Sequence, residues 1–230
     1  MPRLRFLPLI GLLLAGAACA RPRAELAAGA EPAYPRPLEI PAEAWTHASA
    51  AYQHALIRGV VTRPRLTVID YSLPSNVRRL WVVDMATGEV LMNEYVAHAI
   101  RSGGTWATSF SNRDGSRRTS LGTFVTGGTF SGVRGLALHL RGLEPGINDH
   151  ASQRGIVIHG TPGVSAARAR LGRMGRTEGC PAVPRESARR LIGLINEGSI
   201  VFAWYPDRNF LTQSEYVDRY ALTVRLAGSD

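Results

Sequence analysis

Cys180 and His159 are the two residues of this chain whose types and setting favour covalent chemistry. Cys180 stands in the stretch Arg-Thr-Glu-Gly-Cys-Pro-Ala over residues 176–182, and the only other cysteine is Cys19. His159 follows the short apolar run Ile-Val-Ile over residues 156–158. A cysteine thiolate attacks carbonyl carbons, and a histidine elsewhere in the chain can take the thiol proton. The alternative is that Cys180 is a small buried apolar residue, as many free cysteines are.

The residues around Cys180 favour the nucleophile interpretation. Gly179 lets the backbone turn sharply, so the N–H groups of Gly179 and Cys180 are candidate donors to an oxyanion. Arg176 and nearby amide dipoles would lower the pKa of a thiol below its free value of about 8.5. His159 is followed by Gly160, which places the imidazole at the edge of a predicted strand. We therefore predict Cys180 as the nucleophile and His159 as its base.

A metal site is the competing interpretation of the same residue types. His98, His139, His159 and Cys180 all carry atoms that bind zinc. Their spacing lacks a short ligand motif such as His-x-x-x-His, in which both side chains lie on one helix face. We therefore expect no metal site.

The composition sets limits on the class of protein. The chain has 230 residues, enough for one ordinary domain with extensions, and 45% of them are hydrophobic. The chain has 27 arginines and no lysine, so it cannot form a Schiff base through a lysine side chain. The net charge of +9 is spread along the chain without a nucleic-acid motif. We expect no nucleic-acid partner, and an anionic cell-wall or membrane surface explains the charge equally well.

Residues 1–20 predict an export signal. Arginines precede an apolar run over residues 6–15, and small residues follow it up to the Ala-Cys-Ala of residues 18–20. The run is too short to span a membrane, so the mature chain should have no transmembrane span. A lipid anchor on Cys19 is the less favoured alternative, because Gly16 stands where a lipoprotein signal usually has leucine. Either way we expect an exported protein of the periplasm or cell envelope.

The rest of the chain divides into a linker, a helix, a domain and a tail. Residues 21–41 are rich in Ala, Pro and Arg and predict a linker. Residues 42–60 predict an N-terminal helix that packs on the core, with a partner-binding helix as the alternative. Residues 61–208 form the predicted catalytic domain. Residues 209–230 form a weakly patterned tail, with one further strand expected around residues 221–226.

The predicted domain is mainly β, with a sandwich or barrel-like core and a few flanking helices. A helix over residues 184–197 should directly follow the Cys180 turn, since it has an apolar stripe between a proline and a glycine. The long segment 102–118 lacks strand alternation, and we interpret it as a lid or substrate wall, or else a structured surface loop. Strands are predicted over residues 66–71, 80–85, 89–97, 122–126, 136–141, 156–159 and 199–205.

These motifs resemble a known family. His159-Gly160-Thr161, followed after a short insert by Thr177-Glu178-Gly179-Cys180, resembles the L,D-transpeptidase catalytic domain family (YkuD-like), in which His-Gly-Ser/Thr precedes Ser-x-Gly-Cys. The Pro-Ala-Val after the cysteine is similar to the murein L,D-transpeptidase catalytic domain branch. Residues 110–112, 120–122 and 142–144 resemble that branch too, and the resemblance covers residues 66–205.

The chain departs from the family pattern at two positions. Thr177 stands where the family usually has serine, and it retains the hydroxyl. Ala182 stands where the main family has arginine, so Arg176 is the candidate to supply that positive charge. His98 precedes an alanine where the branch often has His-Gly, and we assign it a supporting place at the site. Gly160 and Thr177 complete the predicted substrate-binding or supporting residues.

The resemblance implies a murein L,D-transpeptidase that acts on peptidoglycan stem peptides. Cys180 would attack the carbonyl of the third-position diamino acid of a tetrapeptide, release D-alanine and form a thioester. His159, oriented by a backbone carbonyl, would move the proton. The family chemistry needs no metal or organic cofactor, and we expect a monomer. An L,D-carboxypeptidase that uses water at the same site, and a catalytically silent cell-wall-binding protein, are the alternatives.

Overall fold

The computed structural model describes residues 34–217. The predicted export signal, Cys19 and the strand expected around residues 221–226 lie outside the described residues, as does most of the linker. No helix within residues 34–217 is long and apolar enough to cross a membrane.

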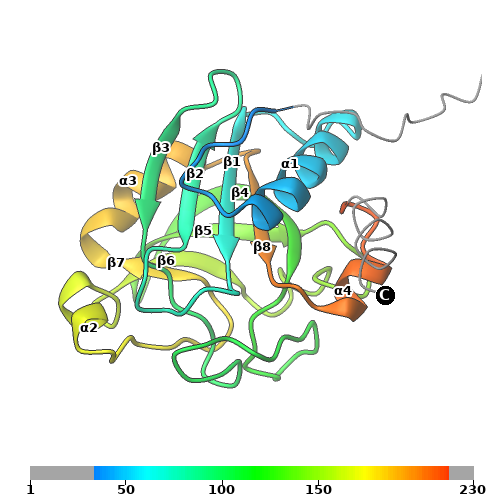
Figure 1. Ribbon diagram of the computed structural model, residues 1–230. Coiled ribbons are helices and arrows are strands. Elements are labelled where there is room, and N and C mark those ends of the chain that lie inside the picture. Colours follow the sequence, from blue (N-terminus) through cyan, green and yellow to red (C-terminus); the bar gives the residue numbers. More distant parts are fainter. Residues whose placement is uncertain (1–33, 218–230) are drawn as a thin grey trace, which may run out of the picture. The chain divides into compact units, whose positions relative to one another are not determined.

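Eight strands form one mixed sheet that curves into a nearly closed barrel (Figure 1). Its strand order is β3-β2-β1-β8-β4-β5-β6-β7. The β1–β8 and β6–β7 pairs are parallel, and the other pairs are antiparallel. The prediction of a mainly β core with a few flanking helices is therefore confirmed. The strands are β1 (Arg65–Asp70), β2 (Leu80–Asp84), β3 (Val90–Glu94), β4 (Gly122–Gly132), β5 (Gly135–Gly142), β6 (Val157–Thr161), β7 (Ala182–Pro184) and β8 (Ile200–Trp204).

The central strands are covered on both faces by helices. All five residues of β8 are buried, and so are five of the six residues of β1. Helix α1 (Ala42–Ile57) contacts β1 and β8, whereas α3 (Arg185–Ile195) contacts β1, β2, β5, β6 and β7. Figure 1 shows the two helices on opposite sides of β1. A strand buried on both faces has mostly apolar residues without alternation, which explains the sequence Ile-Val-Phe-Ala-Trp of β8 and, apart from the buried Thr67, the Leu-Thr-Val-Ile of β1.

The helices bury the stripes that their sequences predict. In α3, Ala188, Leu191, Ile192 and Ile195 are buried, and Pro184 occupies the position before the first helical residue. In α1, the buried residues include Trp45 and Tyr52. The predicted helix that directly follows the Cys180 turn is therefore present, and only the three residues of β7 separate the two.

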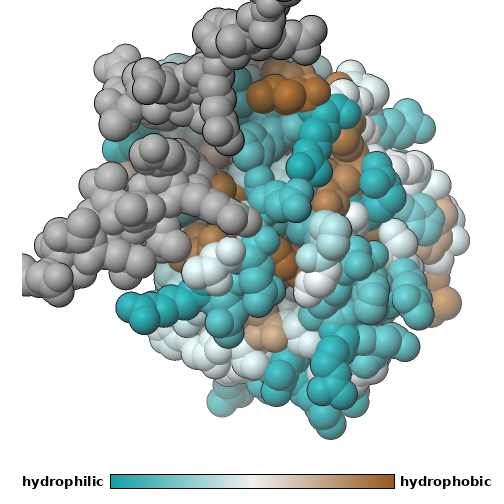
Figure 2. All heavy atoms as spheres, turned by 90° about the vertical axis from the view of Figure 1, so that its right-hand side faces the viewer, coloured by the Kyte–Doolittle hydropathy of each residue, from teal (hydrophilic) through white to brown (hydrophobic). Residues whose placement is uncertain are grey.

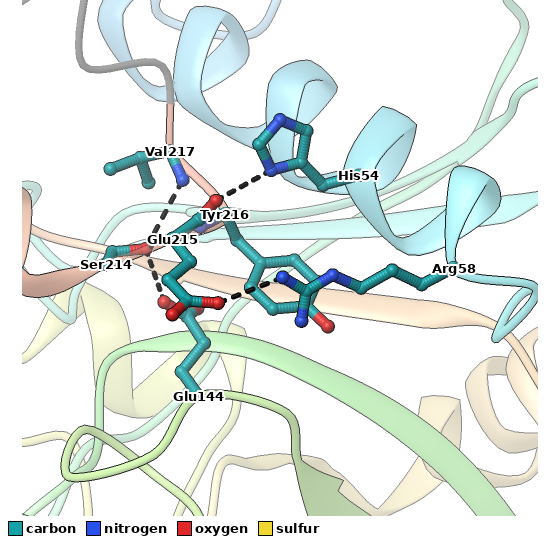
Figure 3. Close-up of polar contacts among 7 residues, drawn as sticks. All are labelled: His54, Arg58, Glu144, Ser214, Glu215, Tyr216 and Val217. Atoms are coloured by element: carbon teal, nitrogen blue, oxygen red, sulfur yellow. Dashed lines mark hydrogen bonds and ion pairs between the residues drawn. The ribbon is translucent and has the colours of Figure 1, made fainter.

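The C-terminal end of the described chain is fastened to two distant elements (Figure 3). Ser214 Oγ donates to the buried carboxylate of Glu144, while His54 Nδ1 in α1 donates to the main-chain O of Glu215 at 2.7 Å. Arg58 Nη2 pairs with Glu215 Oε2 at 2.9 Å. Helix α4 (Arg208–Gln213) lies on the same side of the molecule as α1 (Figure 1). Where this side is visible in Figure 2, it is mostly hydrophilic with scattered hydrophobic patches.

Two differences from the predicted elements bear on the site. Strand β4 continues to Gly132, well past the predicted end at residue 126, and it pairs with β5 in a hairpin. Gly132 and Gly135 are register partners, so Val133 and Arg134 form the two-residue turn. The register shifts at the glycines at 127 and 128, and these residues interrupt the alternation of apolar and polar side chains. The second half of the strand therefore could not be recognised from the sequence pattern. Helices α2 (Ala166–Arg170) and α4 and strand β7 were not predicted, because each is too short to show a period.

Candidate active site

The pairing of β6 with β7 brings the Cys180 turn to the strand that carries His159. These strands are parallel, and His159 is the register partner of Ala182. Cys180 lies two residues before Ala182 in the chain, so the turn that precedes β7 carries the thiol to the strand that carries the imidazole. His159 is buried, with 2% of its surface exposed, whereas Cys180 is partly exposed.

A seam between the two edges of the sheet fixes the Cys180 turn. After β3, the chain runs alongside the turn, where Ala97 forms an antiparallel bridge with Ala182 and Ala99 a parallel bridge with Thr177. Ala97 N donates to Ala182 O at 2.8 Å, and Thr177 N donates to His98 O at 3.1 Å. Main-chain hydrogen bonds on both sides of Cys180 therefore hold the turn to a rigid scaffold.

The imidazole of His159 is in the tautomer that a general base requires. Its Nδ1 lies 3.0 Å from the main-chain O of Gly160, and a carbonyl can only accept, so Nδ1 carries the proton. Nε2 then holds the free electron pair. Gly160 thus provides the orienting backbone carbonyl expected from the resemblance. Burial lowers the pKa of His159, and the positive charge of Arg134 lowers it further. The hydrogen bond to the Gly160 carbonyl has the opposite effect but does not offset burial.

The thiol of Cys180 is held in its protonated form. Burial raises its pKa, and the N–H groups of Val157 and Cys180 and the charges of Arg134 and Arg154 oppose this only in part. Sγ lies 3.7 Å from the main-chain O of Gly155, a weak hydrogen bond. A neutral thiol beside a neutral imidazole requires proton transfer during attack rather than a preformed ion pair.

Within residues 34–217 no hydrogen bond joins the thiol to His159. Instead, Nε2 of His159 accepts from Nη1 of Arg134 at 3.3 Å. Arg134 comes from the turn of the β4–β5 hairpin, which the sequence analysis did not predict. Arg134 lies near His159 because Ala137, three residues further along the chain, is the register partner of His159 in the β5–β6 pair.

The hydroxyl of Thr177 closes the Cys180 turn. Oγ1 donates to Cys180 O at 2.7 Å and accepts from Gly179 N at 3.3 Å. Gly179 has φ +149°, and a Cβ there would lie 2.5 Å from Ile156 Cδ1, so only glycine fits. Because the Gly179 N–H already has an acceptor, the N–H groups of Cys180 and Val157 are the ones directed at Sγ. The oxyanion role assigned to Gly179 and Cys180 stays a prediction.

Gly160 and Arg176 have structural contacts of their own. A Cβ on Gly160 would lie 2.8 Å from Cβ of Ala188, so the glycine allows α3 to pack closely on β6 beside the base. Arg176 is exposed, and its Nη1 donates to the main-chain O of Gly103 at 3.0 Å. The arginine charges that act on the thiol are instead those of Arg134 and Arg154, which come from other parts of the chain.

His98 does not face solvent or substrate space, since its exposed fraction is 0%. Its Nδ1 accepts from Nη2 of the fully buried Arg79 at 2.9 Å. Arg79 also donates to the main-chain O atoms of Val96 and Leu73, and its guanidinium lies 5.0 Å from the ring centre of Tyr71. Burial and the Arg79 charge lower the pKa of His98 to about 4. The main-chain O of His98 accepts from Thr177 N at 3.1 Å, and the supporting role assigned to His98 stays a prediction.

Arg154, in the turn that precedes β6, holds the long segment 102–118 through several hydrogen bonds. Its Nη1 donates to Ser111 O at 2.8 Å, and its Nη2 donates to Arg118 O at 2.6 Å and to Ser116 Oγ at 3.2 Å. Nη1 also donates to Ser120 Oγ. These bonds hold the segment in place, as expected for either a substrate wall or a structured surface loop. Sequence reasoning missed Arg154 because nothing distinguishes it from the other arginines.

The zinc interpretation receives no geometric support. His139 stacks on Phe130, with ring centres 4.5 Å apart. In the described part of the chain, no three His, Cys, Asp or Glu side chains gather as metal ligands.

Comparison with known proteins decides the family. A family model described as "L,D-transpeptidase catalytic domain" matches residues 38–204, well over half of the chain. The chain belongs to the L,D-transpeptidase catalytic domain family. The match includes α1, which the sequence analysis placed before the domain.

Solved structures of L,D-transpeptidases are similar to this family member at low identity. The L,D-transpeptidase from Mycobacterium smegmatis shares 13% identity, with a TM-score of 0.39, and the match covers 62% of this chain and 59% of that one. An L,D-transpeptidase from Xylanimonas cellulosilytica shares 14% identity, with a TM-score of 0.38, and the match covers 66% of this chain and 68% of that one. The helical cell shape determining protein Pgp2 from Campylobacter jejuni shares 12% identity, with a TM-score of 0.43, and the match covers 81% of this chain and 66% of that one. A search of curated proteins gave no match. The family assignment therefore depends on the family model.

Proposed function

We propose that this L,D-transpeptidase family member is a murein L,D-transpeptidase, which acts on peptidoglycan tetrapeptide stems through a cysteine thioester. The observation that carries the proposal is the His159 geometry. Nδ1 is fixed by Gly160, so Nε2 is free of a proton, and the β6–β7 register places this imidazole opposite the turn that carries Cys180. A base of fixed tautomer beside the one cysteine of the described chain suits acyl transfer.

In the acylation step, Nε2 of His159 takes the proton of the Cys180 thiol as Sγ bonds to the carbonyl carbon of the third-position diamino acid. The oxyanion that forms would accept hydrogen bonds from main-chain N–H groups of the turn, for which Gly179 and Cys180 are the predicted donors. The C–N bond to D-alanine then breaks, and the imidazolium returns its proton to the departing amine. The product is a thioester and free D-alanine.

Deacylation reverses these roles. The amine of a second stem peptide attacks the thioester carbonyl, His159 removes a proton from the attacking nitrogen, and the C–S bond breaks. Cys180 regains its proton from the imidazolium. With water as the acceptor, the same residues would give an L,D-carboxypeptidase.

The remaining parts of the proposal concern partners and location. A basic chain of net charge +9 is suited to the anionic cell envelope. We propose that the protein is exported, acts on peptidoglycan stem peptides and uses no metal or organic cofactor.

Product analysis tests the proposal. Purified protein is incubated with a disaccharide tetrapeptide, with or without an added D-amino acid, and the products are identified by mass spectrometry. We expect loss of D-alanine with formation of a cross-linked dimer or an exchanged D-amino acid. Tripeptide as the sole product would replace the transpeptidase with the carboxypeptidase. An unchanged tetrapeptide under all conditions would overturn both the transpeptidase and the carboxypeptidase. The Cys180→Ser variant is the negative control.

A further inference from the structure

The turn of the β4–β5 hairpin places an arginine on the catalytic base. Gly132 pairs with Gly135, so Arg134 lies at the tip of the hairpin. The next pairing along the sheet, Ala137 with His159, brings this tip beside the imidazole. Nη1 of Arg134 lies 3.3 Å from Nε2 of His159.

This contact occupies the electron pair that the reaction needs. Since Nδ1 of His159 donates to Gly160, Nε2 is the acceptor, and Arg134 is the donor. A guanidinium does not give up its proton in proteins. Nε2 cannot take the thiol proton while it accepts from Arg134. The contact must therefore break before Cys180 is activated.

Two arginines lie close enough to the thiol to affect it, and only one of them is free to bind a ligand. Both N–H-bearing terminal nitrogens of Arg154 are committed to acceptors in the segment 111–120. Arg134 is exposed, and among residues 34–217 its guanidinium meets no carboxylate and no main-chain carbonyl. An unpaired cation on an exposed turn can move to an anion at low cost.

The chemistry of the leaving group indicates which anion this is. Nε2 of His159 must return its proton to the nitrogen of the departing amino acid. In an α-amino acid, the carboxylate is attached to the carbon that bears this nitrogen, so it lies within two bonds of the atom that Nε2 approaches. A guanidinium beside Nε2 is therefore beside that carboxylate, and its planar donors suit bidentate pairing with it.

We propose that Arg134 binds the terminal carboxylate of the leaving amino acid, and that this pairing takes Arg134 off His159 and frees the base. The identity of the carboxylate rests on the proposed function, whereas the anion site itself does not. The consequence is selectivity for donors that end in a free carboxylate, so a donor amidated at this position is a poor substrate and leaves the base engaged.

Alkylation of Cys180 tests the anion site without any peptidoglycan substrate. The rates of modification by iodoacetate and by iodoacetamide are measured on the full chain by peptide mass mapping, and their ratio is taken for each variant. Taking the ratio removes any change in thiol pKa, because both reagents react with the same thiolate. We expect Arg134→Gln to lower the iodoacetate/iodoacetamide ratio about tenfold, the effect of one lost charge pair. Arg141→Gln, at the far end of β5 and also exposed, should leave the ratio unchanged.

An equal ratio in wild type and Arg134→Gln overturns the inference, whatever the protein does with peptidoglycan. Arg134→Lys, which keeps the charge without the planar fork, should retain part of the wild-type ratio. Circular dichroism of each variant confirms that the exposed substitutions leave the fold intact.

Turnover then identifies the carboxylate. Tetrapeptide donors ending in a carboxylate or a carboxamide are compared, and we expect Arg134→Gln to lower kcat/KM about tenfold for the carboxylate donor only. An equal loss for both donors would contradict the inference. If neither donor is turned over by wild type, the proposed function fails, and the alkylation ratio still decides the anion site.

Discussion

Arg79 Nη2 donates a hydrogen bond to His98 Nδ1 at 2.9 Å, and both side chains are fully buried. The guanidinium cannot accept a proton, so the imidazole beside it must stay neutral for the contact to form. The main-chain O of His98 accepts from Thr177 N at 3.1 Å, on the N-terminal side of the Cys180 turn. His98 therefore contacts the buried Arg79 through its side chain and the Cys180 turn through its main chain.

This pair makes the fold sensitive to acid. The pKa of His98 falls from 6.5 to about 4 on folding, so the unfolded chain binds more protons between these values. The stability is fully present above pH 6.5 and is lost as the pH falls toward 4, by up to about 3 kcal/mol. His98→Asn, whose Oδ1 can still accept from Arg79, should remove this slope. Denaturant unfolding of both proteins from pH 7 to pH 4 measures the difference, and parallel curves would contradict the assignment.

The Thr177 hydroxyl should be required at the turn, and its methyl group should not. Thr177→Ser retains the bonds to Cys180 O and Gly179 N, and we expect its unfolding free energy to lie within about 0.5 kcal/mol of wild type. Thr177→Val keeps the shape but loses both bonds and should cost about 1–3 kcal/mol. Equilibrium denaturation measures the stabilities. Equal stability of the valine and serine variants would show that the hydroxyl does not hold the turn.

The pH profile of kcat/KM should have a broad plateau. Burial lowers the pKa of the His159 base, so activity should persist below pH 6.5 before the acid limb begins. Burial also raises the pKa of the Cys180 thiol, which moves the alkaline limb above the ordinary thiol range. The expected measurement is a steady-state profile with an acid midpoint under 6.5. An acid midpoint at or above this value would show that His159 is not held neutral in the free enzyme.

Cys180 and His159 should behave as one catalytic unit. Cys180→Ser leaves the neighbours in place but substitutes a weaker nucleophile, and His159→Ala removes the base. Each should reduce tetrapeptide turnover by about a thousandfold or more, and the double variant should lose little beyond the larger single effect. Turnover of the three variants under identical conditions measures this. Multiplicative losses would mean that the two side chains act in separate steps.

Much of the fold is readable from local sequence, because the period of a long element survives in its residues. The stripe in α3, the β-branched residues of β1 and the apolar run of β8 predict these elements to within a few residues. Two short motifs separated by a single insert led to the proposed pairing of Cys180 with His159, and the β6–β7 register shows that the strand of one motif lies beside the strand that follows the other.

The long-range side-chain contacts around Cys180 and His159 are not readable in this way. Arg134 reaches His159 only because two successive strand registers align the hairpin turn with β6, and no local pattern encodes a register. Arg79 precedes β2 in a basic pair that suggests an exposed position, yet it is fully buried and joined to main-chain carbonyls. Burial of such a charge depends on acceptors that are distant in sequence.

Mass spectrometry of the intact protein during turnover tests the central claim most directly. Protein mixed with disaccharide tetrapeptide is quenched in acid at short times, and any adduct is mapped to a peptide. We predict a transient adduct equal to the donor less D-alanine, attached to Cys180 and absent from Cys180→Ser. An adduct on another residue, or wild-type turnover by Cys180→Ser, would contradict the assignment of Cys180 as the nucleophile.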